Sequence, residues 1–102
     1  MKQYYALINK LTTKSGKRDE AITLILESSK PFQNNASCLI SLVYKDTKDP
    51  NVIWVEDVWT NKEDHMTALA QPELRPFIEK TIPLLESMPE QHEVELAGGK
   101  GL

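Results

Sequence analysis

The sequence predicts an α+β fold in which helices cover one face of an antiparallel sheet. The first observation behind this prediction is residues 52–59, Val-Ile-Trp-Val-Glu-Asp-Val-Trp. Successive side chains of a strand point to opposite faces, so this strand is apolar on both faces and must be covered on both. The second observation is the order of patterns along the chain, which predicts strand, helix, strand, strand, helix, helix and strand.

The first half of the chain contains a predicted strand, helix and strand. Tyr4 to Leu11 is rich in aromatic and branched residues, which favour a strand. Residues 17–29 repeat apolar side chains at helical spacing and carry acidic residues in the first turn, where they favour the helix dipole. Lys30-Pro31 ends this helix, and Ser37 to Lys45 is the second predicted strand.

A hairpin and a helix start follow directly. Asp46 to Asn51 consists of turn-forming residues, so it predicts a hairpin between the second strand and residues 52–59. Thr60-Asn61-Lys62-Glu63 fits a capping box, in which the first side chain accepts from the third helical amide and the last reaches back. A short second helix is therefore expected right after Trp59.

The last quarter predicts a third helix, a strand and a tail. Apolar residues between Leu74 and Met88 recur at steps of three and four, although Pro83 should bend the helix or leave only its last turn beyond it. His92 to Leu96 is the fourth predicted strand, and residues 97–102 are a predicted flexible tail. The whole order matches a ferredoxin-like split β-α-β plan.

Composition narrows the possible functions. A chain of 102 residues is expected to form a single domain over residues 1–102. A net charge of -3 argues against nucleic-acid binding, which needs clustered basic residues. The first strand is too short and too polar for a signal peptide or a membrane span, and Cys38 is the only cysteine. We therefore expect a cytoplasmic protein with no membrane or nucleic-acid partner.

The strand at 52–59 also predicts a homodimer. The helices of so small a chain can cover only one face of the sheet, which leaves the other apolar face bare. Monomers rarely expose apolar patches beyond about 300 to 600 Å². A second subunit packed against the bare sheet face would solve this problem, with one tryptophan and one carboxylate on each side of the strand.

Five short segments, in this order, resemble the antibiotic biosynthesis monooxygenase family over nearly the whole chain. They are Ser15 to Asp19, the hairpin ending in Asp49-Pro50-Asn51, Asp57-Val58-Trp59, Thr60 to Glu63, and Gly98 to Leu102. The resemblance implies a dimeric α+β barrel and, as in the quinol and polyketide oxygenases of the family, oxygenation without a cofactor. It implies an electron-rich aromatic substrate, such as a quinol or phenol, and O2.

The chemistry implied by the resemblance needs proton removal in a dry pocket. Asp57 and His65 are the candidate catalytic residues, as base and proton shuttle, and Trp59 and Asn9 are the candidate substrate-binding residues. Each has a plainer interpretation: Asp57 can meet solvent or Lys62, Trp59 can be core, His65 can be exposed near a helix cap, and Asn9 can reach water.

Two departures from the family pattern keep a second function open. Asp57 replaces the usual Glu two residues before the tryptophan, and Ala68 stands nine residues after it, where the family usually has His. A non-catalytic dimeric module that binds a small molecule in the same cleft is therefore the alternative. Asn9 also echoes related haem-degrading enzymes, but the aromatic and axial histidine that those enzymes need correspond to Ala68 and Ile78. No cofactor and no metal are expected, because the two histidines lack ligand spacing.

Overall fold

A single antiparallel sheet forms one layer of the computed structural model, which describes residues 4–102. Its strands are β1 (Tyr5–Thr12), β2 (Cys38–Lys45), β3 (Val52–Trp59) and β4 (Glu90–Val94). They lie in the order β2-β3-β1-β4, so β3 and β1 are central and β2 and β4 are the edges. This order, with the helices placed between strands as predicted, confirms the ferredoxin-like α+β fold.

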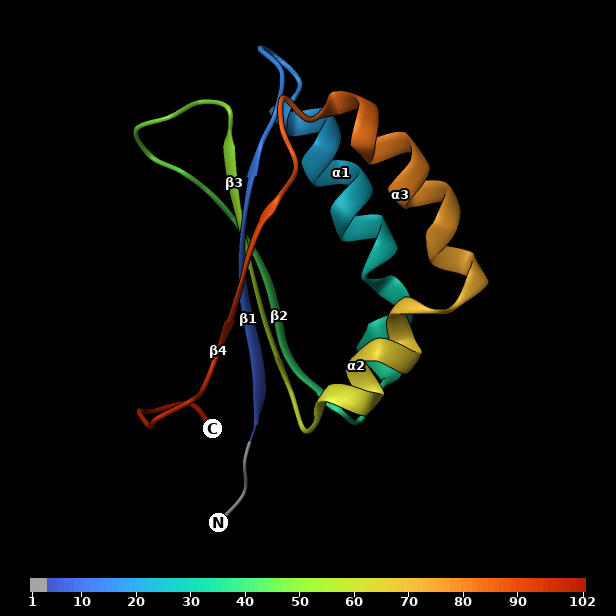
Figure 1. Ribbon diagram of the computed structural model, residues 1–102, viewed down its shortest axis with the longest axis vertical. Coiled ribbons are helices and arrows are strands. Elements are labelled where there is room, and N and C mark those ends of the chain that lie inside the picture. Colours follow the sequence, from blue (N-terminus) through green and yellow to red (C-terminus); the bar gives the residue numbers. More distant parts are fainter. Residues whose placement is uncertain (1–3) are drawn as a thin grey trace.

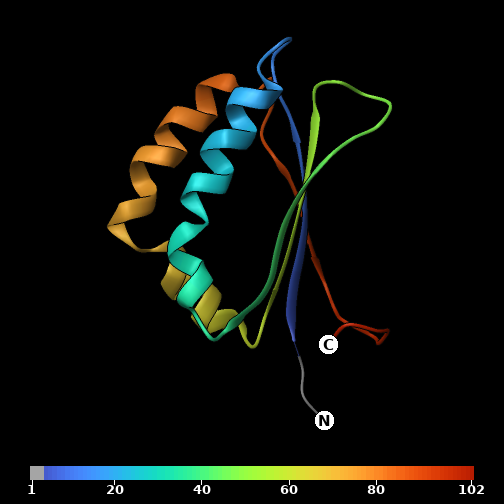
Figure 2. The same ribbon diagram turned by 180° about the vertical axis from the view of Figure 1, so that it is seen from behind.

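The helices form the second layer and all lie on one side of the sheet (Figures 1 and 2). They are α1 (Arg18–Ser28), α2 (Lys62–Leu69) and α3 (Arg75–Thr81). Short 3₁₀ turns extend the helical regions at Lys30–Asn34, Pro72–Leu74 and Ile82–Leu84. The helices therefore cover one face of the sheet, as the sequence predicts, and leave the other without a helix.

One predicted helix boundary was wrong, and one was affected by proline as expected. The cap of α2 is Asn61, whose side-chain oxygen accepts from the Asp64 amide at 2.8 Å, one residue beyond the predicted Thr60–Glu63 pair. The α-helical part of the third helix ends at Thr81 and only the 3₁₀ turn Ile82–Leu84 follows, in agreement with the expected effect of Pro83, which offers no amide for an α-helical bond. Met88 lies outside any helix and is exposed.

The hydrophobic core lies between the sheet and α1. Leu11, Ala21 and Ile53 form its buried centre, and Val43, Val55 and other apolar side chains pack around it. We call the helix-side surface of the sheet the covered face; on β3 it carries Ile53, Val55, Asp57 and Trp59, every second residue of the strand. Both Ile53 and Trp59 are fully buried there.

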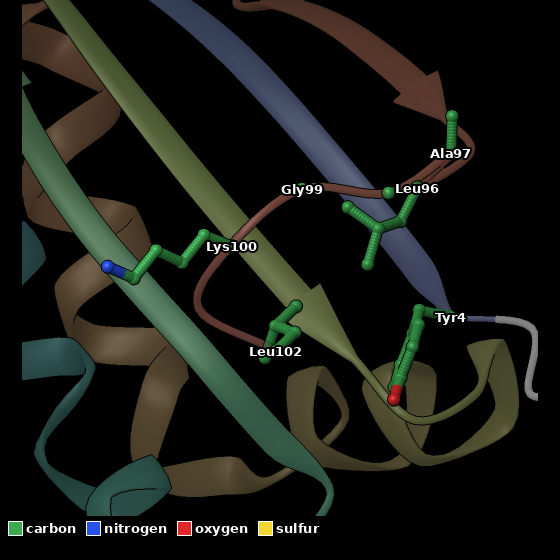
Figure 3. Close-up of a pocket in the computed structure, with 7 residues that line it drawn as sticks. Tyr4, Leu96, Ala97, Gly99, Lys100 and Leu102 are labelled. Atoms are coloured by element: carbon green, nitrogen blue, oxygen red, sulfur yellow. The ribbon is translucent and has the colours of Figure 1, made fainter.

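The opposite side of the sheet, here the bare face, carries the other four residues of β3: Val52 and Val58, which are buried within the single chain, and Trp54 and Glu56, which are half-buried. Ile8, Leu42 and Tyr44 from the neighbouring strands stand in register with this pair, and each is 37 to 47% exposed. Residues 97–102, the predicted flexible tail, bend back on this side (Figures 1 and 2). Tyr4, Leu96 and Leu102 surround a hollow of about 220 Å³ at the bend (Figure 3).

Two turns that are far apart in the sequence contact each other at the end of the sheet where the β2–β3 hairpin lies. Gly16 takes a φ of +75°, a conformation that glycine adopts without strain, in the turn that leads into α1. Arg18 then donates from Nη1 to the carbonyl oxygens of Asp46 and Asp49 at 3.1 and 3.0 Å. The first two of the five segments that carry the family resemblance thus contact each other.

Two further sequence predictions concern the extent of the domain and the possibility of a membrane span. A single domain was predicted over residues 1–102, and residues 1–3 lie outside the described residues. Within residues 4–102, none of the helices has the length and apolar character needed to cross a membrane.

Candidate functional site

Three of the four predicted site residues share the covered face. Asp57 lies between Val55 and Trp59 on that side of β3, and β1 places Leu7 opposite Asp57 and Asn9 opposite Val55. Asn9 lies between the buried Leu7 and Leu11 on the same side of β1, so it faces the helices as well. The strand register therefore aligns Asn9, Asp57 and Trp59 beneath the helical layer.

The fourth predicted residue, His65, joins them from α2. Its side chain is only 6% exposed, so the plainer interpretation of an exposed histidine near the helix cap is wrong. Its ring centroid lies 5.3 Å from that of Trp59, which it meets edge-on, and 5.3 Å from that of Tyr5. The Asn61 cap places His65 one turn into α2, where it points at the sheet.

Three buried polar atoms of this group have no hydrogen-bond partner among residues 4–102. They are Asn9 Oδ1, Trp59 Nε1 and His65 Nδ1. A buried polar atom without a partner costs about 1 to 3 kcal/mol, and such atoms are rare in native proteins. Their residues lie on the covered face or pack against it, on the same side of β3 as Asp57, and a polar ligand bound there would give these atoms partners.

Burial changes the proton affinity of the two titratable groups. The pKa of Asp57 is raised because burial disfavours its charge, and interactions with the Ser41 hydroxyl and His65 partly oppose this rise. The pKa of His65 is lowered by burial, against the attraction of Asp57. The carboxylate is therefore a better proton acceptor than a free aspartate, and the imidazole favours its neutral form.

Sequence reasoning missed three neighbours of this group. Phe32, from the 3₁₀ turn after α1, meets Trp59 edge-on at 5.5 Å between ring centroids. Ser41 of β2 stands directly opposite Asp57, and Tyr5 stands opposite Trp59. The alternation of strand residues would predict that Ser41 and Tyr5 share a face with Asp57 and Trp59, but only when the pairing register of the strands is known. Pro31 predicted the end of the first helix, but nothing in the sequence predicted that Phe32 in the following turn would contact Trp59.

Two hollows flank the group, one at each edge of the sheet. The β2-edge hollow, about 500 Å³, is lined by Phe32, Cys38 and Ser41 together with residues from α1 and the turn after it. The pKa of the Cys38 thiol is raised, first by burial and then by the charge of Asp57. Asp57 therefore lies close enough to the β2-edge hollow for its charge to affect a residue that lines it.

The β4-edge hollow, about 400 Å³, opens beside Tyr5 and His65. At its rim the Tyr5 hydroxyl donates to Glu93 Oε2 at 3.0 Å, and Lys62 Nζ lies 3.6 Å from the same oxygen. Lys62 therefore pairs with Glu93 of β4, whereas the plainer sequence interpretation placed it against Asp57.

The described residues contain no group of three or more His, Cys, Asp or Glu side chains that could hold a metal ion. Ala68, where the family usually has a histidine, is buried. Ile78, the position that would need an axial histidine in a haem-degrading relative, is 48% exposed on α3. Neither position supplies a haem ligand, so the echo at Asn9 is not supported by the residues that haem chemistry needs.

Comparison with known proteins shows which family the chain belongs to. The profile described as antibiotic biosynthesis monooxygenase matches residues 4–80. A structure from Chloroflexus aurantiacus J-10-fl, assigned provisionally to the same group, is 34% identical with a TM-score of 0.84, covering 96% of this chain and 97% of that one.

Two further structures are similar in fold. A point mutant of SnoaB, a cofactor-independent oxygenase from Streptomyces nogalater, has a TM-score of 0.82 at 18% identity, covering 95% of this chain and 96% of that one. A Caulobacter crescentus CB15 protein, also assigned provisionally to the monooxygenases, has a TM-score of 0.86 at 12% identity, covering 95% and 92%. No curated protein matches the sequence. With its profile match over residues 4–80, this chain belongs to the antibiotic biosynthesis monooxygenase family.

Proposed function

We propose that the protein is a cofactor-independent monooxygenase that oxidises a small electron-rich aromatic, a quinol or phenol, with O2. The observation that carries this proposal is the set of three unpartnered buried atoms, on Asn9, Trp59 and His65, on the same side of the sheet as the half-buried Asp57. A planar substrate bearing hydroxyl groups can satisfy such donors and acceptors, and the indole ring offers it a face. We place this activity in the cytoplasm, where a lone thiol such as Cys38 remains reduced.

The proposed reaction draws all its electrons from the substrate. A hydroquinone and O2 yield a hydroxyquinone and water, so the ring gains one oxygen atom while the second leaves as water. Asp57 accepts the hydroxyl proton, which leaves an electron-rich anion able to pass an electron to O2. His65 relays the proton, because its lowered pKa keeps the ring neutral and ready to accept one. Asn9 and the Trp59 indole N–H bind the substrate oxygens.

The proposal includes a homodimer built through the bare face. Ile8, Leu42 and Tyr44 expose apolar surface around Trp54, whose indole is half-buried. Burying apolar area stabilises by about 25 cal/mol per Å², so a shared sheet face contributes several kcal/mol per subunit. The same contact would close the barrel of two sheets that this family's fold implies.

An oxygen electrode tests the proposed activity directly. Purified protein is mixed with a panel of reduced benzoquinols, naphthoquinols and anthrones, and O2 uptake is followed against a no-protein blank. We expect uptake with at least one compound and one oxygen atom from ¹⁸O2 in the product. No uptake above the blank across the panel would contradict the oxygenase proposal.

A binding module without catalysis is the second candidate, and buried Ala68 at the usual histidine position favours it. The two tryptophans distinguish the candidates, because each lies on a different face. In Trp54→Phe protein, the remaining Trp59 reports on the covered face, and a bound quinol should quench its fluorescence. Quenching without O2 uptake would establish the binding module, whereas quenching with uptake supports the enzyme.

A further inference from the structure

The two residues directly opposite Asp57 on the neighbouring strands differ in polarity. On the β1 side the residue opposite is Leu7, which is apolar and 1% exposed. On the β2 side the residue opposite is Ser41, and directly opposed residues in an antiparallel pair lie with Cβ atoms about 4.5 to 5.5 Å apart. Of these two directly opposed residues, only Ser41 carries a hydroxyl donor.

Ser41 also faces the helices, like Asp57. It shares a side of β2 with Val43, two residues along, which packs against the core on the covered face. Ser41 lines the β2-edge hollow with Phe32 and Cys38, and Phe32 in turn contacts Trp59. A substrate in this hollow would thus meet Ser41 before it reaches the carboxylate.

We propose that Ser41 is the positioning residue for Asp57, drawing its carboxylate toward the β2-edge hollow, so that substrate enters from that edge of the sheet. One carboxylate oxygen accepts from the Ser41 hydroxyl, and the other is left to receive the substrate proton. The inference deepens the proposed function and rests on it. Hydrogen bonds to a charged group are among the stronger ones, and they fix orientation as well as charge.

The electrostatic surroundings agree with this role. Burial raises the pKa of Asp57, and the Ser41 hydroxyl is the largest influence that lowers it. His65 of α2 also lowers this pKa, whereas the neighbouring Glu56 raises it. The charge of Asp57 in turn contributes, after burial, to the raised pKa of the Cys38 thiol on β2. Ser41 therefore keeps a buried base ionised at pH values where burial alone would protonate it.

The test compares three variants by NMR titration of the Asp57 side-chain carboxyl and by the pH profile of kcat/KM. Ser41→Ala should shift the Asp57 titration upward, and the acid limb of the profile should move up with it. At pH values below that limb kcat/KM should fall on the order of 10-fold. Ser41→Thr, which keeps a hydroxyl, should restore both. Ser28→Ala, whose hydroxyl donates only to the Ile25 carbonyl in α1, serves as the matched control and should change neither.

The titration judges Ser41 independently of turnover. An unchanged or lowered Asp57 titration in Ser41→Ala would overturn the positioning role, even in an active enzyme. A shifted titration in a protein that oxidises no quinol would support the role of Ser41 while contradicting the proposed activity.

Discussion

Each face of β3 carries one tryptophan and one carboxylate, but the polar groups of the two pairs differ in whether they have hydrogen-bond partners. On the bare face, Trp54 Nε1 donates to Asp46 Oδ1 at 2.9 Å, and Glu56 accepts from the Tyr44 hydroxyl at 2.7 Å. On the covered face, Trp59 Nε1 has no partner among residues 4–102, and Asp57 has a raised pKa. Satisfied polar groups suit a surface built for packing, whereas unsatisfied ones suit a surface built for a ligand. The difference supports the proposal that the ligand binds at the covered face.

The largest expected effect comes from exchanging one carboxylate on each face for its amide. Asp57→Asn should lower kcat/KM for O2 uptake on the order of 100-fold or more, because it removes the proposed general base. Glu56→Gln, one residue away on the bare face, should leave uptake within about 2-fold. Equal losses in the two variants, measured on the oxygen electrode after circular dichroism shows native folding, would break the comparison.

The next effect concerns the bare face itself. Leu42→Asp places a charge in the proposed subunit contact and should weaken dimerisation by about 100-fold or more, because a buried unpaired charge is costly. Ile78→Asp on α3 is the matched control, since Ile78 is 48% and Leu42 47% exposed in the single chain. Sedimentation equilibrium should show monomers for Leu42→Asp and dimers for Ile78→Asp. Monomers in the unmodified protein at micromolar concentration would refute the predicted homodimer.

The smallest expected effect is a pH dependence of stability. The folded-state pKa of His65 lies below its ordinary value, so the unfolded chain binds the proton first as pH falls. Stability from this group is complete above about pH 6.5 and declines as pH falls toward the folded pKa, by at most about 1.4 kcal/mol per pH unit. His65→Gln should flatten this decline in urea unfolding between pH 8 and 5. An identical slope in both proteins would show that His65 does not titrate on unfolding.

The fold was predictable because strand and helix periodicities are local. Residues 52–59 form β3 with the predicted limits, since two-sided apolar character fixes a central strand. The boundary of α2 was predictable only to within one residue, because Thr60 and Asn61 are both good caps and tertiary contacts choose between them. The fourth strand begins at Glu90, two residues before the prediction, because pairing with β1 sustains a segment whose side chains are all exposed.

The site was predictable in part. Asp57 and Trp59 share a face by simple alternation, but the sequence did not show which face the helices cover. The burial of His65 depends on how α2 docks on Trp59, which no local pattern encodes. Ser41 depends on the β2–β3 register, and that register shifts at a bulge between Cys38 and Ile40. The positions of His65 and Ser41 therefore depend on contacts between distant parts of the chain, which sequence periodicity does not predict.

The strict alternation along β3 has a consequence for how this protein can change. A single inserted residue early in the strand would rotate every following side chain by half a turn, placing Glu56 and Val58 beneath the helices and turning Asp57 and Trp59 outward. One insertion would thus remove the proposed base and disturb the subunit contact together. Sequence variation in β3 should therefore occur by replacement, with length preserved, while changes of length nearby should be confined to the hairpin from Asp46 to Asn51, outside the paired region.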